Sequence, residues 1–285
     1  MNKKIDLIKN NKSVALLAPT FVIDFKYPAI IGMLKKLGFT EVTELTFGAR
    51  MVNWAYVQYI KHHPGQPFFI STACPTVVFF IKTQYPEFAK YLIPVASPMV
   101  AMAKIYKKFN PHYKIIFISP CLAKENLEAV KYREFIDAVI TLKELKEIFN
   151  LEGIKEEDFK ERYYFDSFVR QYTRIYPVSG GLASTSHISS LFKEGEVLIT
   201  DGIGNIKKAI EDIKSGKKKH RFLDILNCPG GCIGGPAINN QELPIEKRRE
   251  IIKKYTSRLS EGTMGKHKGK VSDAKDVDLN VKSWD

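Results

Sequence analysis

The sequence predicts an α/β fold of two lobes, each a mostly parallel β-sheet flanked by helices, with a ligand site between the lobes. Short apolar and β-branched runs alternate along the chain with segments of amphipathic, helical periodicity. This alternation is typical of parallel strands joined by crossover helices. The chain has 285 residues, of which 45% are hydrophobic, and this is enough for one substantial domain or two lobes.

Strands are expected wherever a short apolar run is bounded by polar or turn-forming residues. These runs cover residues 14–18, 41–45, 67–71, 92–95, 114–119, 137–141, 196–200 and 222–226. Helices are expected in the amphipathic segments between the strands. These segments cover residues 27–37, 48–62, 76–90, 98–109, 142–149 and 202–214.

The C-terminal part has a different character from the rest of the chain. We expect residues 1–243 to form the two lobes and residues 244–285 to form a basic helix and a tail. The helix is predicted over about 243–259. Residues 260–285 are rich in Gly, Lys and Asp, which predicts an extended or flexible segment.

The formal net charge of +13 raises the question of nucleic-acid binding. Lysines are dispersed along the chain, and the two dense basic runs, at 217–221 and 247–249, contain no aromatic residues. This pattern matches no RNA- or DNA-binding motif. We therefore expect a lysine-rich solvated surface and no nucleic-acid partner. A basic face could also dock an acidic partner protein or a ferredoxin.

The location of the protein is predicted from its apolar segments. The N-terminus has no signal-peptide pattern, and the apolar runs are far shorter than the ~20 residues of a membrane span. We expect a soluble, cytoplasmic protein without a membrane span. Cysteines stay reduced in the cytoplasm, where they bind metals more often than they form disulfides.

All the cysteines of the chain lie in three short loops that also contain proline or glycine. They are Cys74, Cys121, Cys228 and Cys232. Thiolates are the preferred ligands of iron–sulfur clusters, and a four-iron cluster takes four of them. The spacing does not fit the two C-x₂-C pairs of a zinc ribbon. Four buried core thiols are the alternative interpretation, but that would not explain why Cys74, Cys121 and Cys228 each stand beside a proline.

Each cysteine loop follows the end of an expected strand, where open α/β sheets bind their ligands. Pro75, Pro120 and Pro229 stiffen the loops because proline fixes the φ angle. Gly230 and Gly231 allow the backbone to approach a large cofactor closely. Because the cysteines are far apart along the chain, the site must be assembled by tertiary folding between the lobes.

The three loops resemble the cluster-binding loops of [FeFe]-hydrogenases. In that family they read Thr-Ser-Cys-Cys-Pro, Met-Pro-Cys-x-x-Lys-x-x-Glu and Met-x-Cys-Pro-x-x-Cys-x-x-Gly-Gly. The resemblance covers residues 13–240 in matching order. It includes the stretches Leu17-Ala18-Pro19-Thr20, Phe47-Gly48-Ala49, Ala96-Ser97-Pro98, Asp137-Ala138-Val139-Ile140-Thr141 and Val178-Ser179-Gly180-Gly181. No ferredoxin-like cysteine motifs precede it, so the sequence resembles the cofactor domain alone.

The resemblance implies that the four cysteines hold a [4Fe–4S] cluster. It also implies that Cys232 bridges to a [2Fe] subcluster with CO, CN and azadithiolate ligands, and the two parts together form the H-cluster. Lys124 is implied to donate a charge-assisted hydrogen bond to one cyanide, and Pro19 and Thr20 to contact the other. The expected cofactor-binding set is completed by Ser97, Ser119, Gly230 and Gly231.

The departures from the family pattern concern proton transfer. Ala73 stands where active enzymes have the cysteine that delivers protons to the catalytic amine, and a methyl group cannot transfer a proton. The glutamate expected after Lys124 falls at Leu127, with Glu125 and Glu128 on either side. The expected helix 48–62, which supplies relay glutamates in active enzymes, contains no carboxylate. The methionines of the second and third loops are replaced by Ser119 and Leu226.

These features predict a protein that binds an H-cluster and interconverts H₂ with protons and electrons slowly. It resembles the sensory [FeFe]-hydrogenases, which report H₂ or redox state to a signalling module. One alternative is a catalytic hydrogenase with a rerouted proton path through Glu125, Glu128, His62, His63 or water. Another is an iron–sulfur electron carrier or assembly protein that holds only the [4Fe–4S] cluster.

The resemblance also implies partners. They are H₂ and protons, an electron carrier or signalling partner protein, and the maturases that make the two-iron part. Sensory relatives continue into cluster-binding and PAS-type modules that this sequence does not contain. We therefore expect it to work with a separate partner or to be part of a longer protein.

Overall fold

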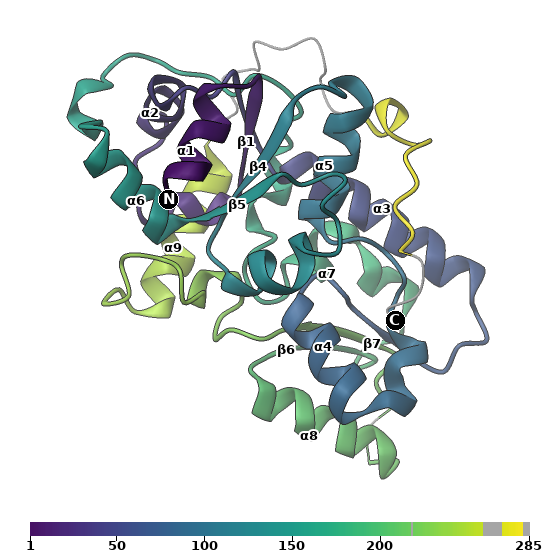
Figure 1. Cartoon of the computed structure of the whole chain (residues 1–285). Helices are drawn as coiled ribbons and strands as arrows, with labels where there is room; N and C mark the ends of the chain where they lie inside the picture. The colour runs from purple at the N-terminus through teal and green to yellow at the C-terminus, as the bar shows by residue number, and fades with distance from the viewer. Residues whose placement is uncertain (218, 259–269, 282–285) are drawn as a thin grey trace.

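The computed structural model describes residues 1–217, 219–258 and 270–281. Two parallel sheets organise these residues (Figure 1). The larger sheet has the order β2-β1-β4-β5 and the smaller sheet the order β3-β7-β6. The larger sheet is made of β1 (Ser13–Leu17), β2 (Glu41–Glu44), β4 (Lys114–Ser119) and β5 (Ala138–Thr141). The smaller sheet is made of β3 (Phe69–Ile70), β6 (Val197–Asp201) and β7 (Phe222–Leu226).

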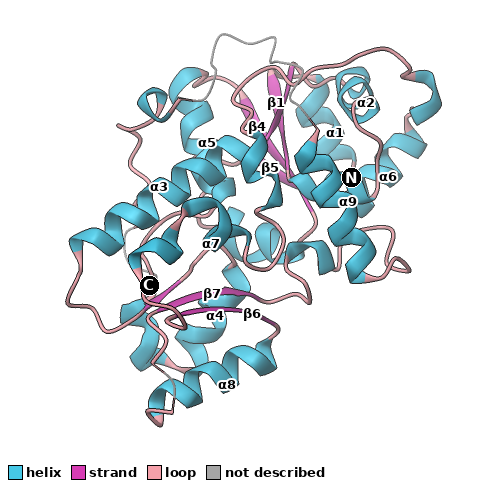
Figure 2. Ribbon diagram, turned by 180° about the vertical axis from the view of Figure 1, so that it is seen from behind, coloured by secondary structure: helices cyan, strands magenta, loops and turns pink. Residues whose placement is uncertain are grey.

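The helices cover both faces of the larger sheet and the outer face of the smaller one (Figure 2). They are α1 (Asn2–Lys9), α2 (Ala29–Leu37), α3 (Thr46–His62), α4 (Pro75–Gln84), α5 (Pro98–Phe109), α6 (Leu142–Leu151), α7 (Gly181–Ser186), α8 (Ile203–Lys214) and α9 (Ile245–Ser257). The two-lobed α/β architecture predicted from the sequence is confirmed.

Alternate residues of each central strand enter different cores, because successive side chains of a strand point to opposite faces. In β1, Val14 and Leu16 pack with α3 and α5, whereas Ala15 and Leu17 pack with α1, α2 and α6. The α3–α5 core also includes Phe69 and Phe222 of the smaller sheet. The two lobes therefore share one apolar core, and this core fixes how the strand ends face each other.

Two predicted elements are wrong in detail. The helix predicted over 76–90 is divided into α4, which ends at Gln84, and a 3₁₀ segment at Pro86–Tyr91. Pro86 has no N–H to donate and disfavours a helical Tyr85. The strand predicted at 92–95 is reduced to isolated bridges from Leu92 to Ile70 and from Val95 to Asn280, since proline, here Pro94, cannot donate to a β-ladder.

The C-terminal region also differs from the expectation of a flexible tail. Residues 270–281 pack on the protein, and their Ala274, Leu279 and Val281 side chains are buried. The Ala96 N–H donates to the Leu279 carbonyl over 2.8 Å. Residues 259–269 and 282–285, the rest of the predicted tail together with the last predicted helical position, lie outside the described residues.

Helices α1 and α7 were not predicted. The α1 sequence is dominated by charges, and only Ile5 and Ile8 are buried. The α7 segment is short and rich in Gly, Ser and Thr, so its composition favours a turn rather than a helix. Both helices are stabilised by tertiary contacts rather than by their intrinsic propensity.

A buried ion pair connects the larger sheet to α9. The Arg174 guanidinium donates from Nε to Glu44 Oε2 over 3.0 Å, and both side chains are at most 1% exposed. The Tyr255 hydroxyl donates to the same carboxylate. Glu44 ends β2, Arg174 lies in the 3₁₀ turn Gln171–Ile175, and Tyr255 belongs to α9. Three segments distant in sequence therefore depend on one charge pair.

Candidate iron–sulfur cofactor site

The three cysteine loops begin at the carboxyl ends of strands from both sheets. Cys121 follows β4 of the larger sheet. Cys74 follows β3, and the loop with Cys228 and Cys232 follows the neighbouring strand β7 of the smaller sheet. The loops therefore meet between the lobes, at the edge where parallel sheets bind ligands.

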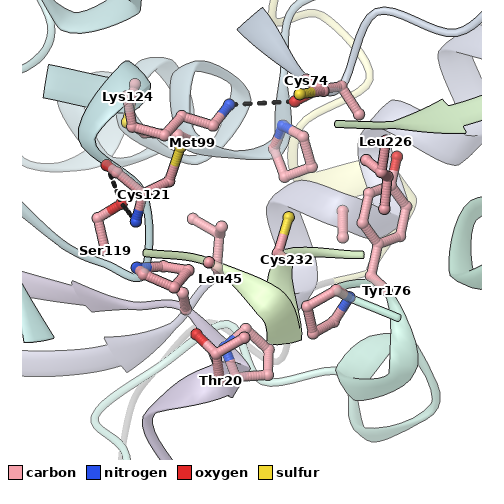
Figure 3. Close-up of a pocket in the computed structure, with 18 of the residues that line it drawn as sticks. Thr20, Leu45, Cys74, Met99, Ser119, Cys121, Lys124, Tyr176, Leu226 and Cys232 are labelled. Atoms are coloured by element: carbon pink, nitrogen blue, oxygen red, sulfur yellow. Dashed lines mark hydrogen bonds between the residues drawn. The ribbon is translucent and has the colours of Figure 1, made fainter. Parts of the chain in front are cut away.

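The four cysteines line one cavity, although up to 158 positions separate them. Figure 3 labels Cys74, Cys121 and Cys232 around it. The empty space between its walls and its mouth is about 880 Å³. Most of the wall is apolar, and it includes Ala49, Met99, Phe117 and Leu226. This is a concave, largely apolar site with a few polar groups, as is typical of cofactor pockets.

The cysteines influence each other's protonation. Burial raises the pKa of Cys228 to about 11, and the charges of Cys121 and Cys74 add to the effect. Burial and the other three cysteines raise the pKa of Cys232 well above its ordinary value. Without a metal these thiols hold their protons. Because a metal binds the thiolate form, binding must release those protons, and a cationic iron cluster would relieve the repulsion among the thiolates.

The cysteine sulfurs surround a space instead of meeting at a point. Among the described residues, no three Cys, His, Asp or Glu side chains stand close enough to bind a single metal ion together. In a cubane cluster each thiolate binds its own iron, so the four donors stand around the cluster. The buried Thr20 Oγ1, at the cavity, and Ser97 Oγ have no hydrogen-bond partner within the protein. The donor set and the Thr20 hydroxyl fit a polynuclear iron–sulfur group.

Lys124 extends across the cavity toward the first cysteine loop (Figure 3). Its Nζ donates to the Ala73 carbonyl over 3.1 Å and to Glu128 Oε2 over 2.5 Å. Burial alone would lower the pKa of Lys124, but Glu128, and Cys121 and Cys74 in their ionised form, raise it. The side chain is therefore a fixed, charged donor at the cavity wall.

Lys124 begins a π-helix at Lys124–Ala129, and Glu128, four residues further on, lies beside the lysine. Glu128 is buried and pairs with Lys124. Glu125 instead points to the surface, where it pairs with Lys4 over 2.7 Å. Of the two glutamates predicted as catalytic, the structure thus brings only Glu128 to the site. The sequence motif could not show this, because it expected a carboxylate at position 127.

The other predicted site residues occupy different positions around the cavity. Pro19, Thr20, Ala73 and Ser119 line it. The Ser119 hydroxyl accepts from the Cys121 N–H over 3.0 Å, so Ser119 shapes the second loop. Ser97, Gly230 and Gly231 do not line the cavity and lie behind its wall. All of these assignments stay predictions.

The helix α3 presents no proton carrier to the cavity. It contributes Thr46 and Ala49 to the wall. His62 and His63 lie at its exposed C-terminal end and line a separate groove with residues 275–280. The helix α3 therefore contributes no carboxylate to the cavity that Ala73 lines.

Gly231 lets the third cysteine loop pass close to the loop at 177–179. Its φ angle is +96°, and a Cβ atom would lie 2.5 Å from the Pro177 carbonyl oxygen and 2.6 Å from the Ser179 nitrogen. We expect Gly231→Ala to lower the free energy of unfolding by about 2–4 kcal/mol, from backbone strain and overpacking. Urea unfolding measures this loss. The control is Gly195→Ala, which has a φ of +80° but no atom within 4 Å, and a loss as large there would exclude the steric explanation.

Asp224 is a functional candidate that the sequence analysis missed. It lies within the buried strand β7, and its carboxylate accepts from the Ala183 N–H over 2.9 Å. No cation among the described residues pairs with it. The sequence does contain a signal for this residue, since Asp224 is the single polar residue of the strand Phe222–Leu226. The hydrogen bond from the Ala183 N–H to Asp224 holds α7 against the smaller sheet.

Asp224 also predicts a pH dependence of stability. Burial raises its pKa from 3.8 to about 6. The folded state thus binds this proton more tightly than the unfolded state, so the contribution is present below about pH 4 and lost as the pH rises through 6. We expect unfolding free energies of the wild type to fall by about 3 kcal/mol relative to Asp224→Asn between pH 4 and 7. Urea unfolding at several pH values measures the difference, and parallel curves would contradict the prediction.

A family model described as "Iron only hydrogenase large subunit, C-terminal domain" matches residues 11–236. The chain belongs to this family. The resemblance found in the cysteine loops is thereby confirmed at the level of the family. None of the helices in the described part combines the length and apolar character needed to cross a membrane.

Curated relatives of the iron-only hydrogenase domain fall into two groups. The periplasmic [Fe] hydrogenase large subunit of Nitratidesulfovibrio vulgaris is 25% identical over 72% of this chain and 61% of its own length. The probable cytosolic Fe-S cluster assembly factor oxy-4 of Caenorhabditis elegans is 22% identical over 79% of this chain and 60% of its own length. The chain thus spans less than two thirds of these relatives.

Solved structures show the same fold. A variant of the [FeFe]-hydrogenase HydA1 from Chlamydomonas reinhardtii superposes with a TM-score of 0.73 at 16% identity, covering 96% of this chain and 91% of that one. At this identity the likeness concerns the fold of the iron-only hydrogenase domain.

Proposed function

We propose that this protein binds an H-cluster and interconverts H₂ with protons and electrons slowly, as a sensor of H₂ or redox state. The observation that carries the proposal is the composition of the cavity. It unites four cysteines with Lys124 and Thr20, the residues implied to contact the two-iron part, and it has Ala73 at the proton-transfer position.

The polar residues of the cavity suit a cofactor with small anionic ligands. When bound, the H-cluster supplies the redox chemistry that splits and forms H₂. Lys124 is charged, buried and held by Glu128, so it can donate to a cyanide without a large loss of side-chain entropy. The unpartnered Thr20 hydroxyl would gain a partner on the opposite side.

The proton route is the part of the site that limits turnover. The Ala73 methyl cannot accept or release a proton, and losing one general acid or base typically costs ~10²–10⁴-fold in rate. No carboxylate of α3 replaces it. Slow turnover with a retained cofactor suits a reporter better than a fast catalyst, and we propose a signalling protein or electron carrier as its partner.

The test is maturation of the purified protein with a synthetic two-iron complex, followed by infrared spectroscopy and an H₂ assay. We expect CO and CN bands and a low rate of H₂ turnover. Ala73→Cys should raise the rate without reaching that of a fast hydrogenase, because the relay carboxylates are also missing. Absence of CO and CN bands would end the H-cluster proposal, and wild-type turnover equal to a fast hydrogenase would end the sensory one.

A rerouted proton path is a second candidate, and Glu128 is the residue that favours it. Glu128 is a buried carboxylate one contact away from the cavity, through Lys124. Its charge also raises the pKa of the half-buried Tyr132, which burial raises further, to about 12. If turnover is fast, Glu128→Gln should reduce it and change its pH profile, whereas Glu125→Gln should not.

A third candidate is an iron–sulfur protein without the two-iron part, which the assembly-factor relatives favour. That function needs the four cysteines but not Lys124. A matured sample that contains four irons and sulfides, but shows no CO or CN bands, would support it.

A further inference from the structure

Two of the buried polar atoms that have no partner in the described part of the protein, in Thr20 and Tyr176, belong to side chains that line the cofactor cavity. Among the described residues, four buried side-chain atoms have no hydrogen-bond partner: Thr20 Oγ1, Ser97 Oγ, Asn53 Oδ1 and Tyr176 Oη. Burying a hydroxyl without a partner costs roughly 1–3 kcal/mol. Thr20 and Ser97 belong to the predicted cofactor-binding set. The same criterion selects Tyr176, which that set did not include.

Comparison with other buried tyrosines shows that this feature is specific to the site. The Tyr56 hydroxyl contacts Thr72, the Tyr106 hydroxyl donates to Glu41, and the Tyr255 hydroxyl donates to Glu44. Each of these hydroxyls lies in the protein interior and has its partner there. The Tyr176 hydroxyl has none, although the structure hides it from solvent.

Tyr176 lies on the cavity wall, on the side of Cys232 and Leu226 (Figure 3). Its backbone is held closely, since the Tyr176 N–H donates to the Thr173 carbonyl over 3.0 Å. A Cβ atom at Gly181 would stand only 2.7 Å from the Tyr176 Cα. With the backbone fixed on both sides, the ring stays at the cavity.

We propose that Tyr176 is a cofactor-binding residue whose hydroxyl donates a hydrogen bond to an electron-rich atom of the iron–sulfur group in the cavity. The acceptor is a cluster sulfur or an iron-bound cyanide, and both are anionic in character. The inference rests on the cofactor site of the proposed function, but not on H₂ turnover.

The electrostatics of the site make the hydroxyl a donor. Burial, together with the charges of Tyr56, Asp224 and Cys232, raises the pKa of Tyr176 well above its ordinary value. The phenol therefore keeps its proton. A hydrogen bond to a cluster sulfur stabilises the more negative, reduced state and raises the reduction potential of the cluster.

The experiment compares the wild type with Tyr176→Phe, which removes one oxygen and keeps the ring. The first readout is the reduction potential of the protein reconstituted with iron and sulfide alone. The second is the set of CO and CN infrared bands after loading the synthetic two-iron complex. The control is Tyr106→Phe, in which the lost hydroxyl was bonded to Glu41.

We expect Tyr176→Phe to bind the same amount of iron, with a more negative cluster potential or shifted CO and CN bands, while Tyr106→Phe matches the wild type. A shift in potential alone assigns the acceptor to the cubane, and a shift in bands alone assigns it to the two-iron part. Unchanged potential and bands would overturn the inference.

The two measurements distinguish a failure of the inference about Tyr176 from a failure of the proposed function. If the wild type shows no CO or CN bands, the H-cluster proposal fails, and the cluster potential alone then decides the role of Tyr176. If the wild type takes up no iron–sulfur cluster, both are wrong.

Discussion

Cys232→Ala is expected to abolish assembly of the iron–sulfur cofactor. Cys232 lines the cavity, and the pKa of its thiol is raised by burial and by the three other cysteines. Three thiolates leave one iron of a cubane without its protein ligand. We expect reconstituted Cys232→Ala to lose the visible absorption of the cluster and to show no CO or CN bands after maturation.

The measurement is iron and sulfide content after reconstitution, with infrared spectra of the matured protein. Asn227→Ala is the matched control, because Asn227 lies in the same loop and lines the same cavity but supplies no thiolate, and its amide donates only a long hydrogen bond, 4.0 Å, to the Cys228 sulfur. It should retain the cluster. Wild-type iron content in Cys232→Ala would contradict the assignment of all four cysteines as ligands.

Arg174→Met is expected to cost about 3–5 kcal/mol of unfolding free energy, because it leaves the Glu44 carboxylate buried without its cation. Glu44 is inaccessible to solvent and its only charged partner among the described residues is Arg174. The same change also removes a contact with α9, since Arg174 Nη1 donates to the Tyr255 carbonyl over 3.4 Å.

Urea unfolding of the cluster-free protein measures this loss. The double variant Arg174→Met, Glu44→Gln should lose less than the single variant, because no charge is left buried. The surface pair Lys247–Glu250 is the control, and Lys247→Met should cost less than about 1 kcal/mol. A single variant as stable as Lys247→Met would show that the buried pair does not hold α9 in place.

Local sequence predicted elements whose boundaries depend on residues within them. The predictions for 98–109 and 114–119 agree with α5 and β4 at both ends, because Pro98 begins a helix and the β4 run is apolar and buried. Local sequence did not predict α7, whose Gly, Ser and Thr residues favour a turn. The carboxylate of Asp224, distant in sequence, accepts from the Ala183 N–H and stabilises that helix.

The side chains of the site also divide into those that the sequence predicted and those that only the structure identified. The motif identified Lys124, because its offset from Cys121 is fixed, but it could not choose between Glu125 and Glu128. The helical offset of four residues that places Glu128 beside Lys124, and the contact of Glu125 with Lys4, made that choice. No sequence motif marks Tyr176 or Asp224. Tyr176 stands out because its buried hydroxyl has no hydrogen-bond partner in the part of the protein that the structure describes, and Asp224 because its buried carboxylate accepts from a backbone N–H.

The sequence by itself determined the fold class and the family, and it indicated the four cysteines that line the cavity, because strand periodicity, proline and glycine positions and thiol chemistry are local properties of the chain. Only the tertiary structure decided which polar groups share the cavity and which are neutralised elsewhere. Burial, hydrogen-bond satisfaction and charge pairing arise between residues that are distant along the chain, and these contacts exist only after folding.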